Sequence, residues 1–173
     1  MDWEIVSAVS SMVTTVIIGA TAIAAVSQIR QLRLSTQLEG LLALHREFNS
    51  PEMGQIRAFV RDELSERLKD ERYRESLLAG DTNIHKHREF VLCNFWEKIG
   101  SLVREGILDP ELYLATGAYR CIEHWKQLRP AIELVRRTEP FQWESFDYMV
   151  ELSRDYLRRR GVERASTPEP TAE

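Results

Sequence analysis

The chain has 173 residues, of which 43% are hydrophobic and 29% are charged, and its formal net charge at pH 7 is −4. This length allows one modest domain with a core of its own, without support from disulfides or metals. Its 23 basic residues are mixed with 27 acidic ones rather than gathered into a stripe, so the composition argues against nucleic acid as a partner.

The first predicted element is a helix that crosses a membrane. No charged residue lies between Ile5 and Ile29. About 25 helical residues, at ~1.5 Å each, span a ~30 Å hydrocarbon core. Asp2 and Glu4 precede this stretch, whereas every Lys and Arg follows it, beginning with Arg30. The positive-inside rule therefore predicts an external N-terminus and a cytoplasmic body.

Two other interpretations of this stretch stay open. A cleaved signal peptide would have a basic start and a shorter apolar core, although Ala22-Ile23-Ala24 resembles a cleavage site. A buried helix of a soluble protein is the other alternative. Serine and threonine residues make the stretch only moderately hydrophobic, so the sequence excludes neither.

Small residues recur at every fourth position of this helix, at Ser7, Ser11, Thr15 and Gly19. Such a face allows a second helix to approach closely, and hydroxyl groups can hydrogen-bond across the contact. The spacing predicts self-association or pairing with a helix of another membrane protein. Chance is the alternative, because small residues fill much of this region.

The residues beyond the span are expected to form helices only. The first helix continues through Gln31–Phe48, because no proline interrupts it. A second begins at Ser50, a favourable N-cap that is followed by proline at the first helical position. The segment Ile84–Arg104 carries a broad apolar face and is predicted to be the central helix.

Two more helices complete the predicted bundle. Asp109 and Pro110 repeat the cap-and-proline signal, and a helix is expected from there to about Leu128, with a kink or restart at Pro130. The last helix follows Pro140 and ends before Gly161.

The predicted fold class is therefore all-α. Residues 1–29 are expected to be a transmembrane anchor, and residues 30–160 a cytoplasmic domain in which the juxtamembrane helix leads into a bundle of about five helices. Residues 161–173 lack large apolar side chains beyond Val162 and are predicted to be disordered.

Several segments, taken in order, resemble a known family. They are Phe48-Asn49-Ser50-Pro51-Glu52-Met53, Asn94–Val103, Gly106-Ile107-Leu108-Asp109, Trp125 and Leu128-Arg129-Pro130. This order is similar to that of bacterial single-span membrane proteins with a helical cytoplasmic domain of unknown function. The resemblance implies a helical fold and a place in the bacterial inner (plasma) membrane, and it implies no catalytic residues.

Candidate sites for chemistry are few. His85 and His87 point about 200° apart on a helix and cannot share a metal, whereas His85 and Glu89 could. The HExxH zinc motif is absent from the sequence. Cys93 and Cys121 fall in apolar helical contexts that suit reduced core thiols. We therefore predict no catalytic residue, no cofactor and no metal site.

A candidate interaction surface comprises Trp96, Gly100, Trp125 and Arg129. Glycine in the middle of a helix often marks a close helix contact, and an arginine four residues after a tryptophan can lie over its indole ring. The alternative is a packed core with a polar rim.

The leading hypothesis for function is a membrane-anchored helical protein-interaction module, lying at the bilayer, whose partner is a second copy or another membrane protein. One alternative is an accessory subunit of a bacterial transporter or channel. Another is a membrane-tethered enzyme with a carboxylate or His/Glu metal site.

Overall fold

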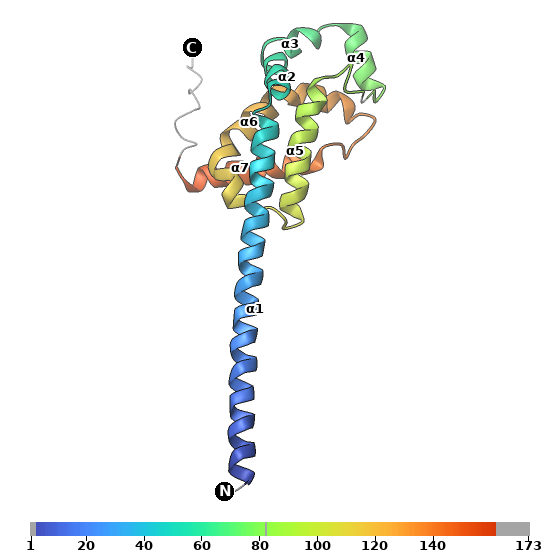
Figure 1. Ribbon diagram of the computed structural model, residues 1–173. Coiled ribbons are helices and arrows are strands. Elements are labelled where there is room, and N and C mark those ends of the chain that lie inside the picture. Colours follow the sequence, from blue (N-terminus) through green and yellow to red (C-terminus); the bar gives the residue numbers. More distant parts are fainter. Residues whose placement is uncertain (1–2, 82, 162–173) are drawn as a thin grey trace. The chain divides into compact units, whose positions relative to one another are not determined.

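A computed structural model describes residues 3–81 and 83–161 of the chain, except for the side chains of residues 3–11, 13, 15, 30, 33, 34 and 36. The described residues form seven α-helices and no strand, so the all-α prediction is confirmed (Figure 1). The predicted disordered tail, apart from Gly161, lies outside the described residues.

The helices are α1 (Trp3–Phe48), α2 (Pro51–Asp62), α3 (Leu64–Arg67), α4 (Glu71–Leu78), α5 (Glu89–Arg104), α6 (Pro110–Val135) and α7 (Glu144–Arg159). The chain divides into two compact units, Met1–Gly40 and Leu41–Glu173. The first unit consists of the greater part of α1, and the second holds the remaining residues of α1 together with α2 to α7.

The predicted transmembrane anchor over residues 1–29 is wrong. Among the described residues, no helix combines the length and the apolar character that crossing a membrane requires. The helix itself is present and has 46 residues, but over its described residues it does not reach the apolar character that a span requires. Hydroxyl groups interrupt its apolar stretch, and one of them, on Thr21, donates a hydrogen bond of 2.7 Å to the carbonyl oxygen of Ile17. The same finding contradicts the prediction of a single-pass protein in the bacterial inner membrane with a cytoplasmic body.

Both predicted cap-and-proline starts are confirmed. The Ser50 hydroxyl accepts a hydrogen bond of 3.1 Å from the amide of Met53, and α2 begins at Pro51. The Asp109 carboxylate accepts one of 2.8 Å from the amide of Glu111, at the start of α6. These side chains satisfy amide groups that have no partner within the first helical turn.

Two helix boundaries differ from the prediction. The central helix α5 begins at Glu89 rather than Ile84, because hydrogen bonds to Asn83 hold the preceding residues in turns. The Asn83 side chain accepts a hydrogen bond of 2.9 Å from the amide of His85, and the Asn83 carbonyl oxygen accepts one of 2.9 Å from the amide of His87. In the other direction, α6 extends past Leu128 to Val135 and continues without a break through Pro130, where a kink or a restart was predicted.

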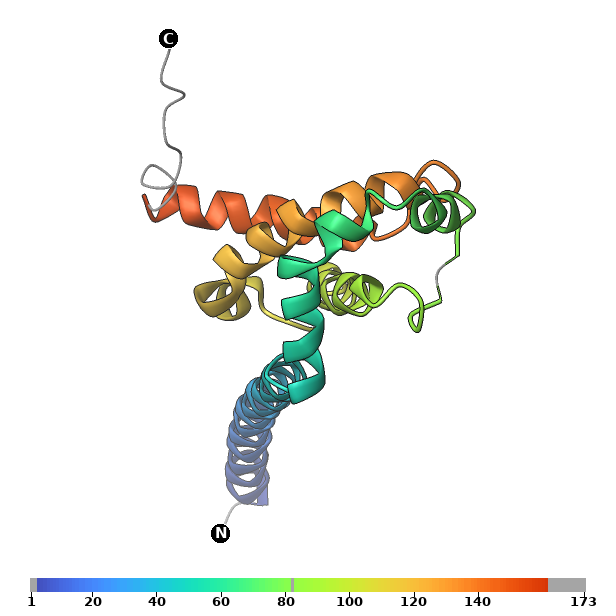
Figure 2. The ribbon, with the colours of Figure 1, turned by 90° about the horizontal axis from the view of Figure 1, so that it is seen from above.

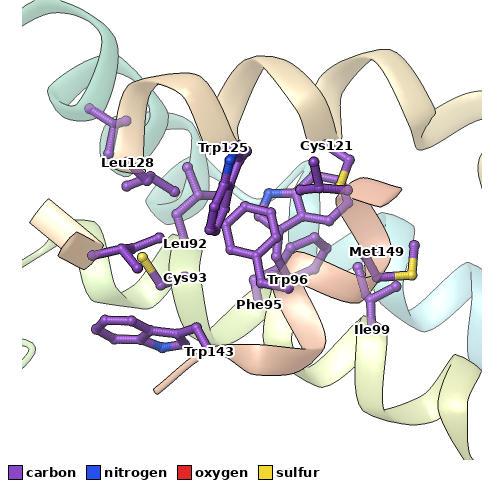
Figure 3. Close-up of a cluster of buried hydrophobic side chains, with 14 of the residues drawn as sticks. Leu92, Cys93, Phe95, Trp96, Ile99, Cys121, Trp125, Leu128, Trp143 and Met149 are labelled. Carbon is purple, nitrogen blue, oxygen red and sulfur yellow. The ribbon is translucent and has the colours of Figure 1, made fainter. Parts of the chain in front are cut away.

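The core of the second unit lies where α5, α6 and α7 meet. Figure 2 shows α7 beside α6. Figure 3 shows the buried side chains that these helices bring together, with Trp96 of α5 near Trp125 and Cys121 of α6 and Met149 of α7. Trp96 and Phe146 are fully buried, and their rings stack with centroids 5.8 Å apart. Aromatic rings are therefore the largest fully buried side chains of this core.

Helices α5 and α7 approach each other very closely at Gly100. A Cβ atom at that position would lie 2.0 Å from the carbonyl oxygen of Ser145. Two side chains of α5 hold the start of α7 there: Asn94 accepts from the indole nitrogen of Trp143 at 2.8 Å, and Glu97 accepts from the amide of Phe146 at 2.8 Å. Gly100 is thus required by packing between two helices.

Candidate functional site

The structure places most of the predicted interaction surface inside the core. Trp96 is fully buried, Trp125 is 9% exposed, and Gly100 is covered by Ser145. Arg129 is exposed and binds Glu133 at 2.7 Å, whereas the guanidinium over the Trp125 ring belongs to Arg136, at 5.6 Å. Three of the four residues can therefore influence a partner only through the core that they form.

The predicted small-residue face belongs to the first unit. The side chains of Ser7, Ser11 and Thr15 lie outside the described residues. Gly19 is described, and a Cβ atom there would meet no described atom within 4 Å. The pairing of this face with another helix stays a prediction. It no longer includes the membrane-spanning placement of the helix.

A cleft between α2 and α6 gathers basic side chains that were not among the predicted site residues. This arginine cleft has a volume of about 370 Å³. Its lining residues are Gly54, Arg57, Ala58, Arg61, Tyr119, Arg120, Glu123, His124 and Gln127.

One aromatic ring lies beneath the two central arginines of this cleft. The Arg57 guanidinium lies 4.3 Å from the centroid of the Phe48 ring, and that of Arg120 lies 5.5 Å from the same centroid. Guanidinium groups are attracted to the face of such rings. Burial, followed by the nearby charges of Arg120 and Arg61, lowers the pKa of Arg57.

The neighbouring His124 is fixed in a neutral form. Its Nδ1 atom lies 3.1 Å from the indole nitrogen of Trp96, which can only donate, so Nδ1 accepts and the proton of the neutral ring is on Nε2. Burial, and then the charges of Arg57 and Arg120, lower the pKa of His124 to about 4. His124 therefore offers an uncharged N–H group at neutral pH.

A second polar cluster is buried between α4 and the start of α5. The Tyr73 hydroxyl donates to Glu89 Oε1 at 2.6 Å, and His87 Nε2 lies 3.0 Å from the Ser76 hydroxyl. His87 Nδ1 lies 3.4 Å from Glu89 Oε1. Burial is the main cause that raises the pKa of Glu89. Both His87 and Glu89 are almost fully buried, so the cluster has little contact with solvent.

The buried cluster pairs Glu89 with His87, whereas the sequence suggested a pair of Glu89 with His85. His85 is exposed in a turn, whereas Glu89 is fully buried and has His87 as its neighbour. Within residues 3–81 and 83–161, no three His, Cys, Asp or Glu side chains gather closely enough to hold a metal ion.

Cys93 and Cys121 are free thiols in the core, as predicted. Burial raises the pKa of the Cys93 thiol well above its usual value and that of Cys121 to about 12. Since the thiolate is the reactive form, neither cysteine is suited to act as a nucleophile.

Sequence signals for both clusters exist, although each is weak. Glu89 lies four residues before Cys93 and seven before Trp96, so it shares their buried face of α5. Arg57 and Arg61 share one face of α2, as Arg120 and His124 share one of α6. The sequence alone does not indicate that these two basic faces lie against each other.

Comparison with known proteins identifies the family but no activity. Residues 14–153 match the model of a domain of unknown function, DUF4760, and the chain belongs to this family. No curated protein and no solved structure matches the chain.

Proposed function

We propose that this member of the DUF4760 family is a helical protein-interaction module that associates with a second copy through the unit formed by residues 1–40. The single observation that supports the proposal is the apolar surface that the described part of this unit leaves in solvent. Large exposed apolar surfaces mark sites of association.

The apolar side chains are exposed on every side of the helix. Val16, Ile17 and Ile18 are 66%, 59% and 64% exposed. Consecutive helical residues point about 100° apart, so these three face different directions. Ile23 and Val26 continue the exposed surface toward Ile29. A helix with apolar side chains on several sides needs partner surfaces along its length to remove them from water.

The second unit does not need these side chains for its own stability. Its core contains Leu44 and Phe48 from the last turns of α1 and extends to Tyr156 of α7. Burial of a valine or isoleucine side chain contributes roughly 1.5–3 kcal/mol. Several such residues per copy supply enough to offset an association cost of ~4–15 kcal/mol.

A second copy is the partner that fits this surface most simply. The stretch from Ile5 to Ile29 carries no charge, so two copies meet without repulsion, and each contributes the same unpartnered apolar surface. The open space around Gly19 allows a second helix to come close.

The test is the molar mass of the full chain in solution, measured by sedimentation equilibrium over a range of concentrations. We expect a multiple of 20.1 kDa. Ile18→Lys is expected to shift the chain toward monomer by placing a charge within the contact. Ile107→Lys is the matched control, because Ile107 is 58% exposed in the second unit. A monomeric chain at all concentrations, or equal effects of the two substitutions, would overturn the proposal.

A further inference from the structure

The arginine cleft carries an excess of positive charge, since its lining holds three arginines and one carboxylate. Within the described ranges, Arg57 and Arg120 form no ion pair, whereas Arg61 is bound to Asp62 at 2.8 Å. The one carboxylate in the lining, that of Glu123, is bound to Lys126 at 2.8 Å. The cleft thus retains two guanidinium groups without a counter-ion.

These two groups are held in place before any ligand arrives. Both lie against the ring of Phe48, which is itself buried. The Nε atom of Arg57 is buried and has no hydrogen-bond partner among the described residues. This atom is closed to solvent, so an anion in the cleft would be bound by the Nη groups of Arg57 instead.

The remaining lining supplies neutral hydrogen-bonding groups. His124 presents its Nε2–H group as a donor without adding charge, as its bond with Trp96 requires. Tyr119 and Gln127 add a hydroxyl and an amide. Donors that are fixed in position and partly dehydrated favour an anion with several acceptor oxygens.

We infer that the arginine cleft is a binding site for a small phosphate monoester, whose phosphate group is bound by Arg57 and Arg120 and accepts a hydrogen bond from His124. A phosphate monoester carries close to two negative charges at neutral pH, which balance the two guanidiniums, whereas a monocarboxylate would leave one of them uncompensated. The planar guanidinium fork also matches phosphate oxygens.

The size of the cleft indicates a ligand larger than phosphate alone. Small-molecule pockets have volumes of roughly 300–1,000 Å³, and this cleft, with about 370 Å³, lies within that range. The organic part of the ester would lie beside Tyr119, which is 58% exposed. All lining residues belong to the second unit, so the inference does not depend on the association proposed for residues 1–40.

The experiment titrates the full chain with phenyl phosphate, inorganic phosphate and acetate at constant ionic strength. Calorimetry measures the affinity, and the NMR signals of the His124 ring report binding at the cleft. Arg120→Gln removes one guanidinium from an exposed position. Arg137→Gln removes the same charge outside the cleft lining and is the matched control. Arg57→Lys keeps the charge but removes the planar fork.

Phenyl phosphate is expected to shift the His124 signals and to bind more tightly than inorganic phosphate, while acetate leaves the signals in place. Arg120→Gln and Arg57→Lys are expected to weaken binding by about tenfold or more, and Arg137→Gln by less than about twofold. Equal affinity for phosphate and its ester would overturn the assignment of an ester. Equal response to acetate, or equal losses in Arg120→Gln and Arg137→Gln, would overturn the site itself.

Discussion

Replacing Gly100 with alanine tests the close contact between α5 and α7. The new Cβ atom would lie 2.0 Å from the Ser145 carbonyl oxygen and 2.5 Å from its carbonyl carbon. The start of α7 would have to move by about 1.4 Å to restore an ordinary contact. Such a movement also strains the bonds of Asn94 and Glu97 to α7, both 2.8 Å long.

Two effects of the Gly100→Ala substitution on the free energy of unfolding oppose each other: alanine favours the helix, whereas its Cβ atom disrupts the packing. Alanine favours the helix by ~1 kcal/mol over glycine. Overpacking costs ~1–3 kcal/mol and occasionally more, and each hydrogen bond that is lost costs ~1 kcal/mol. We expect Gly100→Ala to lower the free energy of unfolding by at least ~2 kcal/mol, which lowers Tm by roughly 6–12 °C in a domain of this size.

Urea and thermal unfolding, followed by circular dichroism, measure this change. Gly54→Ala is the matched control, because a Cβ atom on that helical glycine meets its nearest described side-chain atom, Nη2 of Arg57, at 4.0 Å. We expect the control to be neutral or more stable by up to ~1 kcal/mol. If Gly100→Ala unfolds at or above the wild-type temperature, the close packing of α5 against α7 is wrong.

Three further predictions concern buried titratable groups. The pKa of His124 is lowered to about 4, so the neutral ring stabilises the fold at neutral pH. This contribution to stability is lost as pH falls from about 6.5 to 4. An NMR titration that gives a pKa near 6.5 for His124 would contradict this. The pKa of Glu89 is raised, so its contribution to stability is lost as pH rises above about 4.5. Glu89→Gln should therefore gain stability relative to wild type between pH 5 and 8 in urea melts, and a constant difference would refute the assignment. Cys93 and Cys121 should react with a thiol reagent at pH 8 only at the rate of unfolding, and rapid labelling of the native chain would show that they are accessible.

Local signals in the sequence predicted the secondary structure well. Proline at the first helical position, after a serine or aspartate cap, located the starts of α2 and α6, because these residues act on amides two or three positions away. The start of α5 was missed because the turns around Asn83 compete with helix formation. The absence of charge between Ile5 and Ile29 was overvalued, since no described helix combines the length and the apolar character that crossing a membrane requires.

The candidate sites depend on which helix faces lie against one another, and this information is not local. For Trp96 and Trp125 the sequence left open a candidate interaction surface or a packed core with a polar rim, and the structure places both in the core, where Phe146 of α7 packs against both rings. The arginine cleft arises in the same way, since Arg57 and Arg120 are 63 positions apart and come together only when α2 packs on α6.

The measurement that tests the central claim most directly is photo-crosslinking of the full chain from its first unit. A photoreactive amino acid replaces Ile17, whose side chain is 59% exposed, and the products are identified by mass spectrometry. If residues 1–40 bind a second copy, a mixture of ¹⁴N- and ¹⁵N-labelled chains will yield crosslinked dimers that contain one chain of each kind. Unlinked monomer alone, or a product in which a different protein is attached, would contradict association with a second copy.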